Sequence, residues 1–135
     1  MSNLARTALA IDADLLWQFD AWMAGHGYEN RSQAVRDLIR KALVEQEWSD
    51  PNAEVVAALS IVFDHKQAVT KGLTDMQHED HHAILCSQHV HITHERCLEV
   101  ILMRGKAAQL RRIADAIITT RGVKTGQLTM LSENV

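Results

Sequence analysis

The chain has 135 residues, of which 47% are hydrophobic, so it is long enough for one ordinary domain or two very small ones. Its formal net charge of -3 provides no overall basic field, and composition alone does not favour nucleic-acid binding. No apolar run approaches the roughly 20 residues of a membrane helix, and no secretory signal is present, which favours a cytoplasmic protein with no membrane partner. The two cysteines lack CxxC spacing, so we expect free thiols rather than a disulfide framework.

The first part of the chain predicts one strand and two helices. Residues 5–11 alternate between two faces, which is typical of a short strand. Apolar residues at helical spacing predict a helix over 13–25, with Asp12 as its cap, and a second helix to about Gln46, with Asn30 or Ser32 as its cap. A lone strand has unpaired edges and two short helices cannot enclose a core, so this unit should form an obligate dimer with its strands paired.

The order strand, helix, helix, together with the turn G-Y-E-N-R-S at 27–32, resembles the ribbon-helix-helix DNA-binding family. The resemblance implies that paired strands enter the major groove and that helix amino termini hold phosphates through backbone N–H groups. Such contacts need no net positive charge, although residues 1–48 carry five Lys/Arg against seven Asp/Glu. Alanine on the DNA-facing side of the strand can touch a thymine methyl group but cannot hydrogen-bond a base edge. The implied DNA-contacting residues are Arg6, Ala8, Ala10, Asn30, Arg31 and Ser32.

A linker over 49–53, containing the only proline of the chain, is predicted to separate a domain over 1–48 from a second domain over 54–135. The second domain is predicted to contain strands over 54–63, 83–92, 97–103 and 123–131 and helices over 65–78 and 106–121. The order βαββαβ is that of the ferredoxin-like split unit. We therefore expect an α+β protein, with Cys86 in the core of its second domain.

Residues 78–97 hold six of the eight histidines and both cysteines. Imidazole and thiolate bind late first-row transition metals well at neutral pH. His89 and His91 are two positions apart on a predicted strand, so both project from one face, and a hairpin brings Cys97 beside them. The sequence therefore predicts a metal site of mixed nitrogen and sulfur ligands within one subunit.

His78 is the candidate for a fourth ligand. It lies near the end of the predicted helix, on the order of 20 Å from His89 at ~3.3 Å per residue, so it should not reach the site of its own chain. If edge strands of two such domains pair antiparallel, the His78 end of one domain faces the His89 end of the other. A metal bound there would depend on how two subunits are arranged.

Over residues 4–132 the chain resembles the nickel-responsive NikR regulators. The resemblance implies a homotetramer, built as a dimer of dimers, with a central ACT-like metal-binding and tetramerisation domain flanked by ribbon-helix-helix dimers. It implies one square-planar Ni²⁺ per chain, operator DNA as the partner and repression of nickel uptake.

Gln33 departs from a glutamate found in some members, and the spacer from His65 to His78 is one residue shorter than usual, which leaves a secondary role for His65 open. The implied nickel ligands are His89, His91 and Cys97 of one chain and His78 of another. The matching segments are 77–78, 89–92, 97–100, 104–106 and 121–124.

Two other functions stay open. One is a metal-independent ribbon-helix-helix regulator whose second domain binds another small ligand, and the other is a metal-buffering protein or metalloenzyme without DNA function. The segment 78–82 formally matches the H-E-x-x-H pattern of zinc hydrolases, but that pattern needs a continuous helix, and the predicted helix ends there. The ligand set suits Ni²⁺ or Cu²⁺ in a plane and Zn²⁺ in a tetrahedron, so site chemistry does not choose between nickel and copper.

Overall fold

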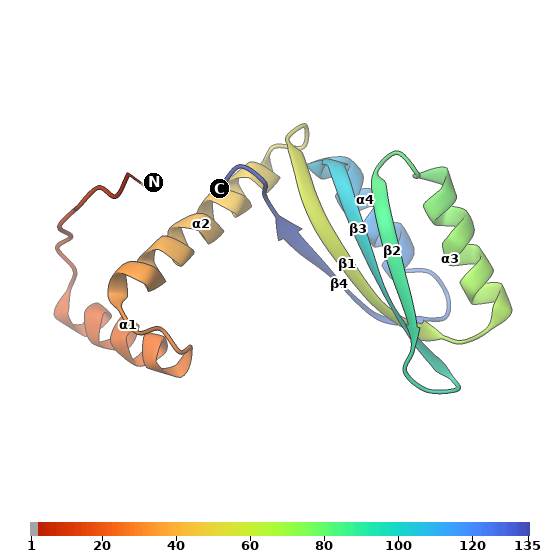
Figure 1. Ribbon diagram of the computed structural model, residues 1–135, viewed down its shortest axis with the longest axis horizontal. Coiled ribbons are helices and arrows are strands. Elements are labelled where there is room, and N and C mark those ends of the chain that lie inside the picture. The colour runs from red at the N-terminus through yellow and green to blue at the C-terminus, as the bar shows by residue number, and fades with distance from the viewer. Residues whose placement is uncertain (1–2) are drawn as a thin grey trace. The chain divides into compact units, whose positions relative to one another are not determined.

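The computed structural model describes residues 3–135, which divide into two compact units between Arg40 and Lys41. None of the helices in this part of the chain combines the length and the apolar character needed to cross a membrane. The first unit contains α1 (Ala13–Gly25) and the beginning of α2 (Arg31–Ser49). The second unit contains the end of α2 and the elements β1 (Glu54–Asp64), α3 (Gln67–Glu79), β2 (Ile84–His91), β3 (Arg96–Lys106), α4 (Ala107–Ile118) and β4 (Val123–Leu131) (Figure 1).

The two helices of the first unit begin and end for local reasons. The α1 helix has the predicted bounds, although the side chain of Asp12 makes no capping hydrogen bond. Gly27, with φ 73°, turns the chain after α1 through the left-handed region that glycine adopts without strain. The backbone N–H of Gln33 donates to Oδ1 of Asn30 at 2.9 Å, so Asn30 caps α2 as predicted.

Residues 3–12 form no helix and no strand in the single chain, so the strand predicted over 5–11 is absent here. A strand is stabilised by backbone hydrogen bonds to a neighbouring strand. No other segment within residues 3–135 pairs with this one. Alternation in sequence therefore indicates what this segment can form, while a pairing partner decides whether it forms.

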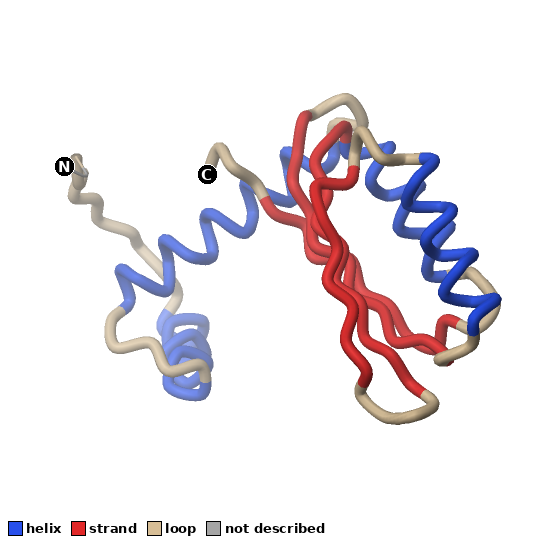
Figure 2. The backbone as a smooth tube through the Cα atoms, turned by 45° about the vertical axis from the view of Figure 1, so that its right-hand side comes forward, coloured by secondary structure: helices blue, strands red, loops and turns tan. Residues whose placement is uncertain are grey.

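The second unit is built on a four-stranded sheet in the order β2-β3-β1-β4, with every neighbouring pair antiparallel. Helix α3 connects β1 to β2, and α4 connects β3 to β4, which gives the βαββαβ order of the split unit. Both helices lie on one face of the sheet (Figure 2). The predicted α+β class is confirmed for this unit.

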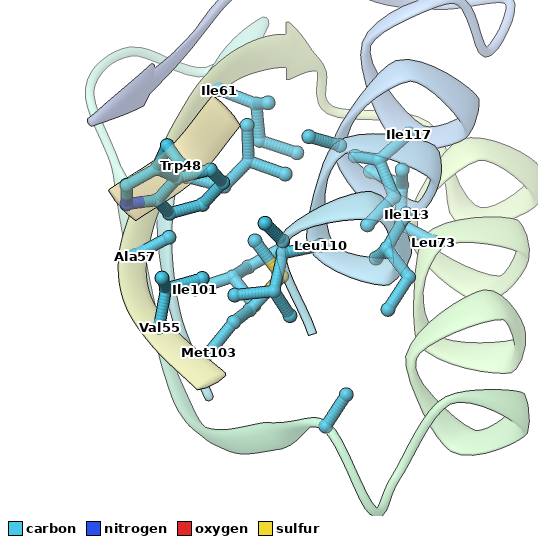
Figure 3. Close-up of a cluster of buried hydrophobic side chains, with 14 of the residues drawn as sticks. Trp48, Val55, Ala57, Ile61, Leu73, Ile101, Met103, Leu110, Ile113 and Ile117 are labelled. Atoms are coloured by element: carbon cyan, nitrogen blue, oxygen red, sulfur yellow. The ribbon is translucent and has the colours of Figure 1, made fainter. Parts of the chain in front are cut away.

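The core lies between the sheet and its two helices. Alternate residues of β1, from Val55 to Phe63, are buried, because successive side chains of a strand point to opposite faces. They pack against Leu73 of α3 and against one stripe of α4 that includes Leu110 and Ile113 (Figure 3). This packing fixes the helix-bearing face of the sheet, which also carries the candidate metal ligands.

Trp48 attaches the last turn of α2 to the second unit. Its side chain is 2% exposed, its Nε1–H donates to the carbonyl of Leu131 at 2.9 Å, and the guanidinium carbon of Arg111 lies 5.4 Å from its ring centroid. These contacts explain why α2 extends past the predicted end at Gln46 and why the division between compact units falls inside α2. A linker role for residues 49–53 stays a prediction.

The other face of the sheet carries no helix. Leu102 on this face is 41% exposed. Cys86, which is paired with Leu102 across β2 and β3, is also exposed, so the prediction that it lies in the core is wrong. The reason is that β2 is an edge strand and that Cys86 points away from the helices.

Candidate metal centre

The β2–β3 hairpin sets the positions of three predicted ligands. In its register His91 pairs with Cys97, and His89 pairs with Glu99. Directly paired residues of antiparallel strands project from the same face. Cys97 and Glu99 are buried under the helices, so both histidines belong to the helix-bearing face as well.

Three side chains converge at the end of the sheet where β3 begins. Sγ of Cys97 lies 3.2 Å from Nδ1 of His65 and 3.4 Å from Nδ1 of His91. Within residues 3–135 this is the one group of three His, Cys, Asp or Glu side chains near enough to share a metal ion, with all ligand atoms within 4.8 Å of one another. The sulfur is buried, whereas both imidazoles are exposed.

His65 is the member of this group for which the sequence analysis predicted no definite role. It lies two residues beyond Phe63, which is paired with Cys97, so the alternation of β1 carries His65 onto the same face. Its backbone N–H donates to the carbonyl of Glu95 at 2.9 Å and holds the chain beside the β2–β3 turn. The continued alternation of β1 could have revealed this position. The predicted helix start at residue 65 concealed it, because α3 in fact begins at Gln67.

His89 borders the group without being part of it. Its ring centroid lies 5.2 Å from that of His91, and its ring meets Phe63 edge-on at 5.4 Å. The single chain therefore brings together His91 and Cys97 of the predicted ligand set, with His89 alongside them.

His78 lies in the last turn of α3 and outside the group of three. Its neighbour Gln77 donates through Nε2–H to Oε1 of Glu99 at 2.8 Å. Glu99 is 6% exposed and lies two residues from Cys97 on the same strand face. A buried carboxylate thus connects the end of α3 to the strand that carries the thiol.

Burial raises the pKa of the Cys97 thiol, and the negative charge of Glu99 raises it further. The metal-free sulfur accordingly keeps its proton in the neutral pH range. The ligand form of cysteine is the thiolate, so a metal ion that binds here must displace this proton.

Comparison with known proteins identifies the family of the chain. The family model described as the NikR C-terminal nickel-binding domain matches residues 56–131, which include the whole hairpin. The chain belongs to the NikR family. A protein of Solibacter usitatus (strain Ellin6076) is 48% identical over 131 residues, covering 96% of this chain and 94% of that protein. One of Pyrococcus abyssi (strain GE5 / Orsay) is 43% identical over 131 residues, covering 96% and 95%. Both carry the name "Putative nickel-responsive regulator".

A solved structure resembles part of the chain in its fold. An uncharacterized protein from Thermotoga maritima matches with a TM-score of 0.54 and 12% identity, covering 58% of this chain and 99% of that one. At this identity the likeness concerns the fold alone. The NikR relatives carry regulator names rather than enzyme names, so the chain is a regulator and not an enzyme.

The local structure also separates this NikR chain from the zinc hydrolases. Helix α3 ends at Glu79, and Asp80 closes it with a backbone N–H to the carbonyl of Met76. Nδ1 of His81 then lies 3.1 Å from the carbonyl oxygen of His78, in the turn after the helix. The H-E-x-x-H segment is therefore not presented on one helical face, which is what hydrolase chemistry requires.

The candidate DNA-contacting residues lie in the first unit. Arg31 is engaged within that unit, because its Nε–H and an Nη–H donate to the two carboxylate oxygens of Asp20 at 2.8 and 2.6 Å. This paired contact connects α1 to the first turn of α2. The residues of the candidate set are all exposed: Arg6, Ala8, Ala10, Asn30, Arg31 and Ser32.

Proposed function

We propose that this NikR family member is a repressor that binds operator DNA when it carries nickel and thereby limits expression of nickel-uptake genes. The observation that carries the proposal is a buried thiol beside imidazoles inside the domain that matches the nickel-binding family. In the proposed nickel state, His89, His91 and Cys97 of one chain and His78 of a partner subunit hold one Ni²⁺ per chain. Square-planar ligation by nitrogen and sulfur suits this ion.

The residues of the chain fit the proposed ion. The register across β2 and β3 fixes His91 beside Cys97, and His89 lies on the same face next to His91. A side-chain rotation of His89 toward the sulfur would complete three donors from one chain. Ni²⁺, when bound, would favour four donors in a plane. One chain would offer three, so a fourth donor is needed.

A second copy would supply the fourth donor. β2 is an edge strand, so one row of its backbone groups is unpaired in the single chain. Antiparallel pairing of two β2 strands would bring the end of α3 in one subunit toward His89 of the other. Dimers of this kind, combined through their first units, would give a homotetramer built as a dimer of dimers.

The first unit supports a dimeric DNA-binding role because it has little core of its own. Among its described residues, Met23 and Ala34 are the buried apolar side chains, whereas Leu9 is 65% exposed. Pairing with a second copy would cover such side chains and would give residues 5–11 a strand partner. The paired strands would then present Arg6 to base edges in the major groove.

Nickel can regulate DNA binding only if both ligands prefer the same arrangement of subunits. A metal held between two chains favours the arrangements in which all four donors meet. By linkage, operator DNA that selects the same arrangement tightens nickel binding by the same factor.

The test is fluorescence anisotropy of labelled DNA from the upstream region of the gene, titrated with the full chain in the metal-free form and with one Ni²⁺ per chain. We expect nickel to tighten binding by roughly 10- to 100-fold, a typical size for coupling between two sites. Cys97→Ala should abolish this response, whereas Cys86→Ala, which removes the other thiol, should retain it.

Each alternative has its own result in this titration. Equal binding by the metal-free and nickel forms would contradict the nickel response and favour a metal-independent regulator. A Cys97→Ala chain that loses nickel but keeps metal-dependent DNA binding would refute the proposed ligand set. Absence of binding in both forms would contradict the DNA function and would direct attention to Ala8 and Ala10.

A further inference from the structure

We propose that α2 is the lever through which nickel occupancy acts on the first unit, and that a clasp of side chains fixes the end of this lever to the second unit. The clasp consists of Glu47 and Trp48 in the last turn of α2 and of residues 131–134 at the end of β4 and beyond it. Glu47, Trp48 and Asn134 act in it as positioning residues. The existence of the clasp stands on the geometry of the second unit, and its role in regulation rests on the proposed function.

Two hydrogen bonds join the last turn of α2 to residues 131–134, which lie 83 and 87 positions further along the chain. The indole Nε1–H of Trp48 donates to the carbonyl of Leu131 at 2.9 Å. The side-chain amide of Asn134 donates through Nδ2–H to Oε1 of Glu47 at 2.7 Å. The end of α2 is thereby bonded to the strand that forms one edge of the sheet.

Burial makes the clasp contacts unfavourable to break. Trp48 is 2% exposed, so its indole N–H would lie away from water if it lost its acceptor. Oε2 of Glu47 is buried and meets no hydrogen-bond donor among residues 3–135, so the amide of Asn134 is the contact that compensates this carboxylate. An Nη–H of Arg104 on β3 donates to Oε1 of Glu133 at 2.7 Å and holds the same segment against the sheet.

The turn that follows α2 is fixed to the second unit as well. The backbone N–H groups of Ala107 and Ala108 donate to the carbonyls of Ala53 and Pro51 at 2.9 and 3.1 Å. These donors open α4, and the first N–H groups of a helix have no partner within the helix itself. Residues 51–53 thus cap α4, so the chain between α2 and β1 is held in place and offers no free joint.

The rest of α2 connects the clasp to the first unit. It is a single helix from Arg31 to Ser49, and the division between the two units falls inside it. Val44 packs against the core of the second unit, whereas residues 40–43 are exposed. The helical backbone of this exposed turn therefore joins the anchored end of α2 to its beginning, and a rigid element of this kind can carry a displacement from one end to the other.

The clasp and the candidate metal centre lie at opposite ends of the sheet. Cys97 and Arg104 are near the two ends of β3, on the order of 20 Å apart at ~3.3 Å per residue. Strand β1 pairs with β3 along its whole length, from Glu54 to Asp64, so the sheet between the two places is continuous. Nickel that rearranges subunits in the proposed way would move this sheet as one body, and the clasp would make α2 move with it.

The first experiment needs neither nickel nor DNA. Native-state hydrogen exchange on the full chain measures amide protection along α2, which we expect to be higher over residues 44–49 than over 40–43. A double variant, Trp48→Phe with Asn134→Ala, keeps an aromatic ring in the core and removes both hydrogen bonds. It should speed exchange over 44–49 by roughly 10- to 100-fold and leave β1 unchanged. Asn52→Ala, which removes a side-chain amide outside the clasp, should exchange like the natural chain.

The second experiment measures the coupling between nickel and DNA. Metal-free and nickel-loaded chains are titrated with labelled upstream DNA, and Ni²⁺ affinity is measured without DNA by competition with a chelator. The double variant should bind Ni²⁺ as tightly as the natural chain, while the factor by which nickel tightens DNA binding should fall by roughly tenfold or more. Asn52→Ala should retain both the nickel affinity and the coupling.

The two experiments decide separate claims. Unchanged exchange over 44–49 in the double variant, or an equal acceleration in β1, would overturn the clasp. Undiminished coupling in the double variant, or a matching loss of Ni²⁺ affinity, would overturn the lever. A natural chain that binds DNA equally with and without nickel would refute the proposed function and the lever together, while the exchange result would still decide the clasp.

Discussion

At the scale of single residues, two exposed imidazoles and one buried sulfur define the candidate centre. The sequence was sufficient to place His91 beside Cys97 on one face, because a two-residue spacing on a strand and a tight turn determine which side chains share a face. It was not sufficient to place His65 beside them, because a strand end and a helix start are hard to separate when β1 passes into α3 within three residues.

Gly126 on β4 is a residue at which packing permits no side chain. A Cβ placed there would lie 2.6 Å from Cγ1 of Ile118 and 3.1 Å from Cγ2 of Ile61, between α4 and β1. We expect Gly126→Ala to lower the free energy of unfolding by about 1–3 kcal/mol through overpacking. Urea denaturation followed by far-UV circular dichroism measures this change.

The control for Gly126 is a glycine in open space. Gly72 lies inside α3, and a Cβ there would have no neighbour within 4 Å. Gly72→Ala should raise the free energy of unfolding by about 0.5–1 kcal/mol, because alanine has the higher helix propensity. Equal effects of the two substitutions would contradict the packing explanation.

At the scale of elements, the agreement between sequence and structure depends on whether an element finds its partners within one chain. The α1 helix and β4 have the predicted bounds, and β1 shows the predicted alternation of burial. The strand over 5–11 has no partner in the single chain and does not form. Cys86 was assigned to the wrong environment because apolar neighbours in sequence do not reveal that β2 lies at the edge of the sheet.

The ion pair between α1 and α2 predicts a pH dependence in the first unit. Hydrogen bonding and charge attraction from Arg31 lower the pKa of Asp20 below its ordinary value of 3.8. A carboxyl group with a lower pKa in the folded chain stabilises the fold fully above its unfolded pKa, and this contribution disappears as pH falls through the folded value. Asp20→Asn should therefore be less stable than the natural chain at neutral pH, and the difference should close in acid.

Thermal unfolding at a series of pH values measures this difference, which should be small because both side chains are largely exposed. Arg31→Gln provides the matched background, since Asp20→Asn should then have little further effect. A stability difference that stays constant from neutral to acid pH would show that the lost interaction is not the ion pair.

At the scale of the whole molecule, the uncovered face of the sheet predicts association between chains. Leu102 is 41% exposed on this face, and Glu at this position would introduce a charge into any contact formed there. Leu102→Glu should therefore shift the chain to smaller assemblies in sedimentation velocity. Ala108→Glu, on the exposed side of α4, makes the same type of change on the helix-covered side and should leave the assembly unaltered.

An unchanged sedimentation coefficient for Leu102→Glu would mean that this face stays open to solvent and that association uses other surfaces. Assembly is also the level at which a single sequence is least informative. Exposed apolar residues in the first unit indicate that another chain packs against this surface, but they do not define how the two chains are oriented.

The position of the sulfur beneath two exposed rings has a kinetic consequence. An ion that bound here would meet His65 and His91 at the surface before it could reach Cys97, which is buried. We therefore expect capture by nitrogen to come first and bond formation to sulfur, with loss of its proton, to come last. In the reverse direction the bond to the thiolate would be the first to break, and the exposed imidazoles would be the last donors to release the ion.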